Sequence, residues 1–242
     1  QNYERSYQIH TKIMGILNVT PDSFYDGGVY NSKEKIKKDI RKFERYGDII
    51  DVGAESSRPG SDPVSIDDEI SRLADFFDNF KIRIPISLDT YKFETFQKYS
   101  GRISYINDIS ALSDERFYDY LPETDHKIII LHMLGKPKTM QDDPHYDDVI
   151  DEITSFFDEK IERMVKSGID LDRIIIDPGI GFGKRYSDNI RILREIDGFK
   201  RFGTKILVGH SNKRYLRNIL NDDYEDLREF GSIGVSSYLI LK

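Results

Sequence analysis

The chain repeats one unit along most of its length: a short apolar run rich in β-branched residues, a polar break, and a segment with helical periodicity. Seven such runs occur, at residues 12–18, 48–51, 84–89, 103–107, 127–132, 173–177 and 205–209. Between them, apolar residues recur at intervals of three and four, for example over 33–46, 65–80, 147–166 and 188–196. Apolar strands that alternate with helices predict a parallel sheet covered on both faces. No low-complexity linker interrupts the pattern, so we predict a single domain over residues 1–242.

The composition limits the partners of this 242-residue chain. Its 43 acidic and 36 basic residues give a formal net charge of -7, which does not favour a surface that neutralises nucleic-acid phosphates. There is no cysteine, which excludes thiolate metal sites and a cysteine nucleophile and suits an intracellular protein. No apolar run approaches the roughly 20 residues that span a bilayer, and residues 1–10 are too polar for a secretory signal. We therefore expect a cytoplasmic protein with neither nucleic acid nor membrane as a partner.

The predicted strands end close to polar side chains. These are Asn18, Asp51, Asp89, Asn107 with Asp108, His132 and Asp177, and the seventh run is followed by His210 and Ser211. In a (β/α)₈ barrel the carboxyl ends of all strands surround one mouth, where active sites lie. A doubly wound open sheet would gather polar residues mainly around one switch point. The pattern therefore favours an α/β protein with a TIM (β/α)₈ barrel and a polar pocket.

Only seven strands are predicted, whereas a closed barrel of this kind has eight. Residues 226–242 show a helical pattern, and no strand follows them. An unclosed barrel would expose two long sheet edges. We therefore expect that the eighth strand and helix are missing from the given chain, that a partner supplies the strand, or that the fold closes in an unusual way.

Six segments at the strand ends resemble the successive motifs of dihydropteroate synthases, in the order of that family. They are GILNVTPDSF at 15–24, GAESSRPG at 53–60, SLDT at 87–90, INDI at 106–109, HMLG at 132–135 with TMQ at 139–141, and DPGIGFGK at 177–184. The resemblance implies a (β/α)₈ barrel. It also implies an enzyme that joins 4-aminobenzoate to 6-hydroxymethyl-7,8-dihydropterin diphosphate and releases pyrophosphate, in folate biosynthesis. The family is a target of sulfonamides.

Three of the strand-end residues suit the recognition of a pterin ring. A pterin presents a 2-amino-4-oxo edge, which requires acceptors for its N–H groups and a donor for its carbonyl in a dry cavity. Asp89, Asn107 and Asp177 supply such acceptors. The alternative for each is that a strand-end Asp or Asn caps the following helix. The resemblance assigns all three to the pterin and adds Lys213 and Met133 to the pocket.

The glycine-rich loop at 177–184 does not match a nucleotide-binding loop. The stretch from Gly179 to Lys184 is one residue too short for G-x-x-x-x-G-K-[ST], and Arg185 stands in place of the hydroxyl residue. We expect its glycines to let the backbone approach a flat ring, with Phe182 stacking on that ring or closing over it. A tight turn without a ligand is the alternative.

The resemblance also implies a site for the diphosphate and its metal. The amide oxygen of Asn18 would be one ligand of Mg²⁺, and phosphate oxygens and water would supply the others. Residues 20–24 and 57–59 would be loops that cover the site and help to form the aminobenzoate pocket. Ser57 lies in the second loop, and Arg58 would contact the anion. The predicted catalytic residues are Arg58, Asp89, Asp177 and Lys213.

The sequence departs from the family at two places. The family motif Ser-Arg-Lys after the seventh strand corresponds here to Ser211, Asn212 and Lys213, so Asn replaces Arg. We still expect Ser211 to receive the aminobenzoate carboxylate. The family's eighth strand carries an Arg-x-His pair that contacts the diphosphate, and no counterpart precedes Lys242. Two further hypotheses therefore stay open, a pterin-binding protein without synthase activity and a pterin-dependent methyltransferase-type barrel. A homodimer is possible in each case.

Overall fold

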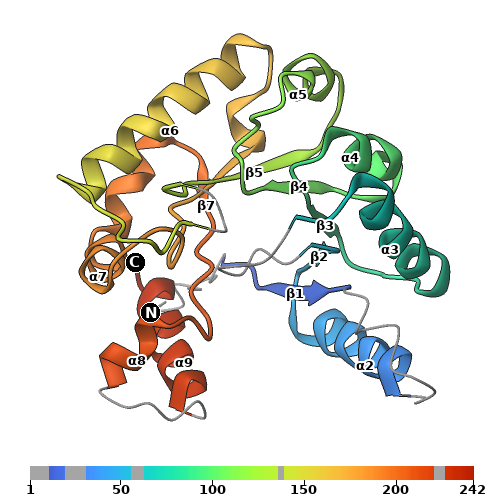
Figure 1. Ribbon diagram of the computed structural model, residues 1–242, viewed down its shortest axis with the longest axis horizontal. Coiled ribbons are helices and arrows are strands. Elements are labelled where there is room, and N and C mark those ends of the chain that lie inside the picture. The colour runs from blue at the N-terminus through green and yellow to red at the C-terminus, as the bar shows by residue number, and fades with distance from the viewer. Residues whose placement is uncertain (1–10, 20–30, 56–62, 136–138, 221–226) are drawn as a thin grey trace, which may run out of the picture.

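The computed structural model describes residues 11–19, 31–55, 63–135, 139–220 and 227–242. Its centre is a parallel sheet of seven strands, which are hydrogen-bonded in chain order (Figure 1). They are β1 (Met14–Asn18), β2 (Ile49–Gly53), β3 (Ile86–Asp89), β4 (Tyr105–Asp108), β5 (Lys127–Leu131), β6 (Ile174–Asp177) and β7 (Lys205–Ile206). An order without reversal is that of a barrel rather than of a doubly wound sheet. The predicted α/β fold is confirmed as a curved, seven-stranded parallel sheet, and closure by an eighth strand stays a prediction.

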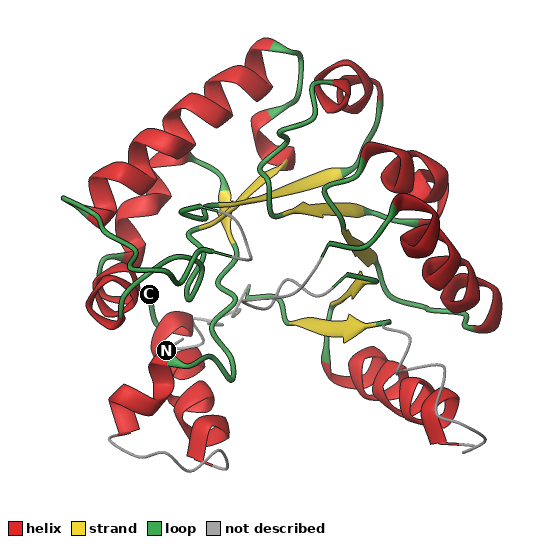
Figure 2. Cartoon of the chain, in the orientation of Figure 1, coloured by secondary structure: helices red, strands yellow, loops and turns green. Residues whose placement is uncertain are grey.

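Helices surround the curved sheet on its outer side (Figure 2). They are α2 (Asn31–Tyr46), α3 (Ile66–Asn79), α4 (Phe93–Tyr99), α5 (Arg116–Tyr120), α6 (Val149–Lys166), α7 (Tyr186–Arg194), α8 (Tyr215–Leu220) and α9 (Leu227–Ile240). Short 3₁₀ turns lie at Ser100–Arg102, Leu121–Glu123, Leu171–Arg173 and Ile196–Phe202. Helix α3 begins where predicted because the Ser65 hydroxyl accepts the backbone N–H of Asp68 at 3.1 Å. Within the described residues, no helix is long and apolar enough to cross a membrane.

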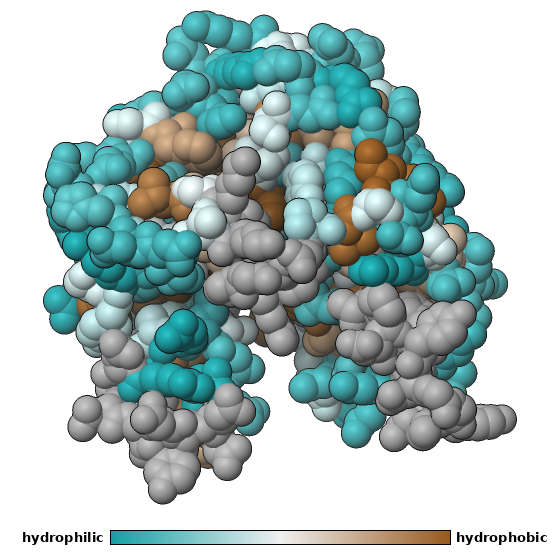
Figure 3. Space-filling model, viewed as in Figure 1, coloured by the Kyte–Doolittle hydropathy of each residue, from teal (hydrophilic) through white to brown (hydrophobic). Residues whose placement is uncertain are grey.

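Two apolar layers hold the sheet. The larger lies between the sheet and the helices, and its fully buried aromatic side chains are Phe76, Phe96, Phe117, Phe157 and Phe199. The smaller lies on the inner side of the curve and consists of Ile49, Tyr105, Ile129 and Ile175. Side chains two positions apart on a strand point to the same side. Asp51 lies two positions after Ile49 on β2, and Asn107 lies two positions after Tyr105 on β4. Both polar side chains therefore point to the inner side of the sheet, next to the inner apolar layer. Hydrophilic side chains cover most of the outer helices on the face seen in Figure 3.

Two strands end two or more residues from the predicted position, while β4 and β5 differ from it by one residue. β2 continues to Gly53, so Asp51 lies inside the strand and does not end it. The strand continues because the backbone of residues 51–53 stays in register with β1 and β3, and the Asp51 carboxyl accepts a hydrogen bond from Asn107 within the sheet. β7 ends at Ile206, although the backbone N–H of Leu207 still donates to Ile176 at 2.9 Å.

Candidate active site

One row of residues crosses the carboxyl edge of β1 to β4. Asn18 is in register with Gly53, Gly53 with Asp89, and Asp89 with Asn107. Neighbours in register on parallel strands point to the same side of the sheet, so this row presents one amide, one carboxyl and a second amide to the inner side. A Cβ atom at Gly53 would lie 3.1 Å from Oδ2 of Asp89. The glycine therefore leaves the space that the Asp89 side chain occupies.

A second carboxyl, from Asp51, lies beneath this row. Its Oδ2 accepts a hydrogen bond from Nδ2 of Asn107 at 3.0 Å, and the residue is only 5% exposed. Burial raises the pKa of Asp51 to about 6, and the charge of Asp177 contributes to the increase. Burial also raises the pKa of Asp89 well above its usual value, with the charges of Asp51 and Glu69 adding to the effect. Asp51 and Asp89 therefore hold a proton at a higher pH than an exposed aspartate does.

A third carboxyl, from Asp177, ends β6 and is 4% exposed. Its Oδ1 accepts the backbone N–H of Gly179 at 2.8 Å. Burial raises the pKa of Asp177, while the positive charges of Lys213 and Lys184 and the N–H of Gly179 act in the opposite direction. The charge of Asp177 also helps to raise the pKa of Asp51, so the two carboxyls interact although they lie on β6 and β2.

Lys213 places its ammonium group beside Asp177. A Cβ atom at Gly209 would lie 3.6 Å from Oδ2 of Asp177 and 3.7 Å from Nζ of Lys213, so both groups border the same glycine. The Nζ atom donates to the carbonyl of Ile180 at 2.6 Å and lies 4.4 Å from the centre of the Phe182 ring. Burial lowers the pKa of Lys213 to about 8, although Asp177 opposes this change. The amine is thus a hydrogen-bond donor held next to a carboxyl acceptor.

The glycines of the loop 177–184 serve contacts within the protein. Gly179 and Gly183 have φ angles of 71° and 61°, which glycine adopts without strain. A Cβ atom at Gly179 would lie 2.0 Å from the carbonyl oxygen of His132, and one at Gly183 would lie 2.5 Å from that of Leu134. This corrects our expectation for these two positions, because the backbone that they approach is that of the segment after β5.

Lys184 and His132 form a buried pair that the sequence analysis did not identify. The Nζ atom of Lys184 lies 3.0 Å from Nδ1 of His132, and it donates to the carbonyls of His132 and Phe182 at 3.1 and 3.0 Å. Burial lowers the pKa of Lys184 to about 7 and that of His132 to about 3, so the imidazole is neutral at pH 7. The sequence offered one signal, a lysine directly after the glycine-rich loop. That signal helps to exclude a nucleotide-binding motif and does not by itself indicate the contact with His132.

Helix capping does not explain the site aspartates. Lys92, not Asp89, occupies the N-cap position of α4, and Arg185, not Asp177, occupies that of α7. Asp108 differs, because its carboxyl accepts two backbone N–H groups of the following turn, at 2.6 and 3.1 Å. Asp108 therefore stabilises a turn, whereas Asp89 and Asp177 remain available to a ligand.

The other predicted site residues lie around these groups. Met133 and Phe182 are half-buried in the loops after β5 and β6, and Ser211 is exposed in the turn before α8. Asn212 has a φ of 54°, which asparagine tolerates better than most residues, and its backbone N–H donates to Ser232 of α9 at 2.9 Å. Ser57 and Arg58 lie outside the described residues.

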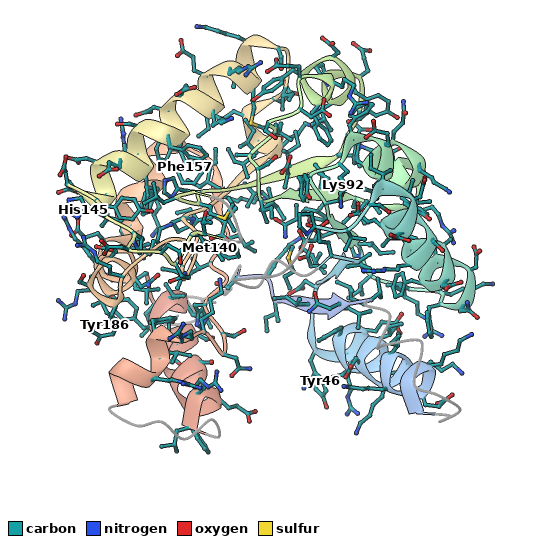
Figure 4. The ribbon with its side chains drawn as sticks, in the orientation of Figure 1. Tyr46, Lys92, Met140, His145, Phe157 and Tyr186 are labelled. Carbon is teal, nitrogen blue, oxygen red and sulfur yellow. The ribbon has the colours of Figure 1, made fainter. Side chains whose placement is uncertain are left out.

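The segment after β5 closes on the same region. Met140 is buried and lies toward the middle of the molecule, whereas His145 and Tyr186 lie at its periphery (Figure 4). The Nε2 atom of Gln141 donates to the carbonyl of Gly181 at 2.8 Å, which joins this segment to the loop after β6. No group of three or more His, Asp or Glu side chains in the described part of the chain is arranged to hold a metal ion.

A curved parallel sheet with buried hydrogen-bonding groups at its carboxyl edge defines an α/β protein that binds a small polar molecule. The family model of the pterin binding enzymes matches residues 14–242, and the chain belongs to this family. The chain is 40% identical to the dihydropteroate synthase of Escherichia coli K12 over 217 residues, which are 88% of this chain and 77% of that protein. The resemblance predicted from the six motifs is thereby confirmed.

Solved structures agree with this assignment. The crystal structure of a Yersinia pestis dihydropteroate synthase with a sulfonamide drug complex has a TM-score of 0.83 and 34% identity, covering 94% of this chain and 84% of that one. A Xanthomonas albilineans dihydropteroate synthase with 4-aminobenzoic acid has a TM-score of 0.83 and 33% identity, covering 95% and 84%.

Proposed function

We propose that the protein is a dihydropteroate synthase, which condenses 6-hydroxymethyl-7,8-dihydropterin diphosphate with 4-aminobenzoate to give 7,8-dihydropteroate and pyrophosphate. The relatives at 40% identity carry this name, and a similar Xanthomonas albilineans structure holds 7,8-dihydropteroate. The observation in this chain that supports the proposal most is the set of acceptors at the carboxyl edge of the sheet. They are the half-buried Asp89 and Asn107 and the buried Asp177, which has the donor Lys213 beside it.

These four groups match the polar edge of a pterin. The carboxyls of Asp89 and Asp177 and the amide oxygen of Asn107 accept N–H groups, and the ammonium group of Lys213 donates to a carbonyl. The half-buried Met133 and Phe182 supply apolar contacts to the flat faces of the ring. Binding in this way would hold the pterin in one orientation at the carboxyl edge of the sheet.

The reaction replaces one bond at the methylene carbon by another. The amine nitrogen of 4-aminobenzoate forms a bond to that carbon, the bond from carbon to the diphosphate oxygen breaks, and the nitrogen loses a proton. The chain contributes mainly by positioning the reactants and by stabilising charge on the leaving group. Arg58 would contact the diphosphate, and Ser57 would belong to the loop that covers it. Ser211 would receive the aminobenzoate carboxylate.

Magnesium is part of this proposal. Asn18 lies exposed at the carboxyl end of β1, and an amide oxygen is a hard ligand of the kind that Mg²⁺ accepts. Mg²⁺ typically keeps several water ligands and binds substrate phosphates, so one protein ligand suits it. When bound, the ion would supply positive charge to the departing diphosphate.

A direct assay tests the proposal. The purified full-length protein is incubated with the pterin diphosphate, 4-aminobenzoate and Mg²⁺, and dihydropteroate and pyrophosphate are measured. We expect equal amounts of both products, dependence on Mg²⁺, and inhibition by sulfonamides that competes with 4-aminobenzoate. Absence of product from folded, full-length protein would contradict the proposal.

One observation favours a second candidate, a pterin-binding protein without synthase activity. Asn212 occupies the position of the family arginine and is exposed. Calorimetry separates the two functions. A synthase should bind the diphosphate ester much more tightly than 6-hydroxymethylpterin when Mg²⁺ is present, whereas a protein that only binds the ring should bind both equally.

Three further expectations complete the proposal. We expect a cytoplasmic protein, which fractionation of source cells tests. We expect a homodimer, which sedimentation at several concentrations tests. We expect a barrel closed by an eighth strand with an Arg-x-His pair, and the intact mass and sequence of the natural polypeptide test this point.

A further inference from the structure

We propose that Asp51 is a positioning residue that fixes the side-chain amide of Asn107, so that the amide oxygen faces the bound pterin. The inference rests on the proposed function, because it concerns how one pterin acceptor is oriented. It assigns a role to a carboxyl that ends no strand and caps no helix.

The contact spans three strands. Asp51 lies on β2 and Asn107 on β4, with β3 between them. Asp51 is in register with Ser87, and Ser87 is in register with Tyr105, two positions before Asn107. The two side chains meet above β3, with 3.0 Å between Nδ2 of Asn107 and Oδ2 of Asp51. Ser87 is fully buried beneath them, and its small side chain leaves room for this contact.

The chemistry of the two groups sets the direction of the amide. A carboxylate oxygen only accepts hydrogen bonds, so the group that Asn107 turns toward Asp51 is its NH₂. The amide oxygen of Asn107 then points away from β2. Without the carboxylate, the amide could rotate by half a turn and present NH₂ groups to a ligand that itself carries N–H donors. Asp51 thus determines whether Asn107 acts as an acceptor.

The burial of Asp51 is not explained by a gain in stability. Its second oxygen, Oδ1, and the hydroxyl of Ser87 have no hydrogen-bond partner of ordinary geometry among the described residues. The Ser87 hydroxyl is nevertheless near enough to lower the pKa of Asp51. Leaving a buried acceptor unpaired disfavours folding. A group kept at such a cost, in contact with a site residue, is typical of functional sites.

A double-mutant cycle tests the inference. Binding of 6-hydroxymethylpterin is measured by calorimetry for the wild type, Asp51→Leu, Asn107→Ala and the double variant. We expect Asp51→Leu to weaken binding by about tenfold, which is the loss of one oriented hydrogen bond. We expect the double variant to bind no more weakly than Asn107→Ala, because Asp51 acts through Asn107. Multiplied losses would overturn the inference.

A conservative variant and a matched control separate positioning from folding. Asp51→Asn retains an oxygen that accepts from Asn107, so its affinity should stay within about threefold of the wild type. Asp108→Asn changes a fully buried carboxyl whose oxygens accept backbone N–H groups of a turn, and its pterin affinity should also be kept. If Asp51→Leu does not fold, Asp51→Ala replaces it in the cycle.

Kinetics provide a second readout. Asp51→Leu should raise the KM for the pterin diphosphate while leaving the KM for 4-aminobenzoate unchanged, and a general loss of folded protein would change neither KM. A folded wild type that binds no pterin would overturn the proposed function together with the inference. A wild type that binds pterin, with losses that multiply in the cycle, would overturn the inference alone.

Discussion

The two sides of the candidate site bury aspartates in opposite electrostatic surroundings. On the β2 to β4 side, Asp51 and Asp89 lie close to other carboxyl groups. On the β6 to β7 side, Asp177 lies beside two lysines, Lys184 and Lys213. Burial raises the pKa of the aspartates on both sides, but only Asp177 has nearby ammonium groups that favour its charged form. The comparison shows that neighbouring charges, more than residue type, determine what each aspartate offers a ligand.

The effect on the lysines is reciprocal. Burial lowers the pKa of Lys184 to about 7 and that of Lys213 to about 8, and Asp177 opposes both changes. The β6 to β7 side therefore holds the carboxyl of Asp177 with two amines, Lys184 and Lys213, each of which is only partly protonated near neutral pH. The β2 to β4 side holds an oriented amide and two carboxyls, Asp51 and Asp89, whose pKa values burial raises above that of an exposed aspartate. A pterin edge with alternating donors and acceptors can contact both sides at once.

Replacing Asp177, the aspartate of the β6 to β7 side, should have the largest effect on pterin affinity. Asp177→Asn removes the carboxylate that both lysines stabilise, and it takes away the negative charge that favours the charged form of Lys213. We expect pterin affinity to fall by at least about 100-fold, since hydrogen bonds to charged groups contribute about 1.5–3 kcal/mol and a buried unpaired charge adds to the loss. Calorimetry with 6-hydroxymethylpterin measures this change.

Asp108→Asn is the matched control for that substitution. Asp108 also ends a strand and is fully buried, but it accepts backbone N–H groups of a turn on the helix side. Its replacement should lower the unfolding temperature and keep pterin affinity within about threefold. Equal losses of affinity in both variants would contradict the division between site and turn aspartates.

Much of this comparison could be predicted from the sequence. The apolar runs and their chain order indicate the parallel sheet, and polar residues at three of the strand ends identify Asp89, Asn107 and Asp177. The helix at 65–80 is also predicted correctly, because a periodic apolar pattern and a capping serine agree there. The short helices α4, α5 and α8 were not predicted, since five to seven residues carry too little periodicity.

The pairings within the site could not be predicted. Asp51 and Asn107 are 56 positions apart, and His132 and Lys184 are 52 apart. Their contacts depend on how neighbouring strands are aligned, which apolar periodicity does not determine. For the same reason, Asp51 was interpreted as a strand end when it is an interior strand residue.

The buried amine of Lys184 should make folding stability depend on pH. Its pKa is about 7 in the folded protein and 10.5 in an unconstrained lysine, so the unfolded chain binds more protons between these values. Stability should therefore rise with pH from about 7 to 10, by up to about 1.4 kcal/mol per pH unit. Denaturant unfolding at several pH values should show this slope in the wild type and a smaller one in Lys184→Met.

An exposed lysine provides the control for that measurement. Lys98→Met, in α4, should keep the wild-type dependence of stability on pH because its side chain is in contact with water. An identical slope in the wild type and Lys184→Met would show that Lys184 does not lose its proton in this range.

Replacing the second lysine should have a smaller effect on binding. Lys213→Met removes a positive charge beside Asp177, so the pKa of Asp177 should rise further and its carboxylate form should become less populated. We expect pterin affinity to fall by about 10- to 30-fold at pH 7, and the further loss on acidification to begin at a higher pH than in the wild type. Lys205→Met changes an exposed lysine of β7 and should leave both quantities unaltered. An unchanged pH dependence in Lys213→Met would show that the amine does not affect Asp177.

The smallest expected effect on pterin affinity comes from filling the space beside Asp89 on the β2 to β4 side. A Cβ atom in Gly53→Ala would lie 3.1 Å from Oδ2 and 3.2 Å from Cβ of Asp89, so the Asp89 side chain must move by a few tenths of an ångström. We expect a loss of pterin affinity of about 3- to 10-fold, because an acceptor that moves by this amount keeps a longer hydrogen bond. Gly101→Ala is the control, since its Cβ atom would have no neighbour within 4 Å. Affinity that is unchanged in Gly53→Ala would mean that Asp89 needs no fixed position, and that the β6 to β7 side alone orients the pterin.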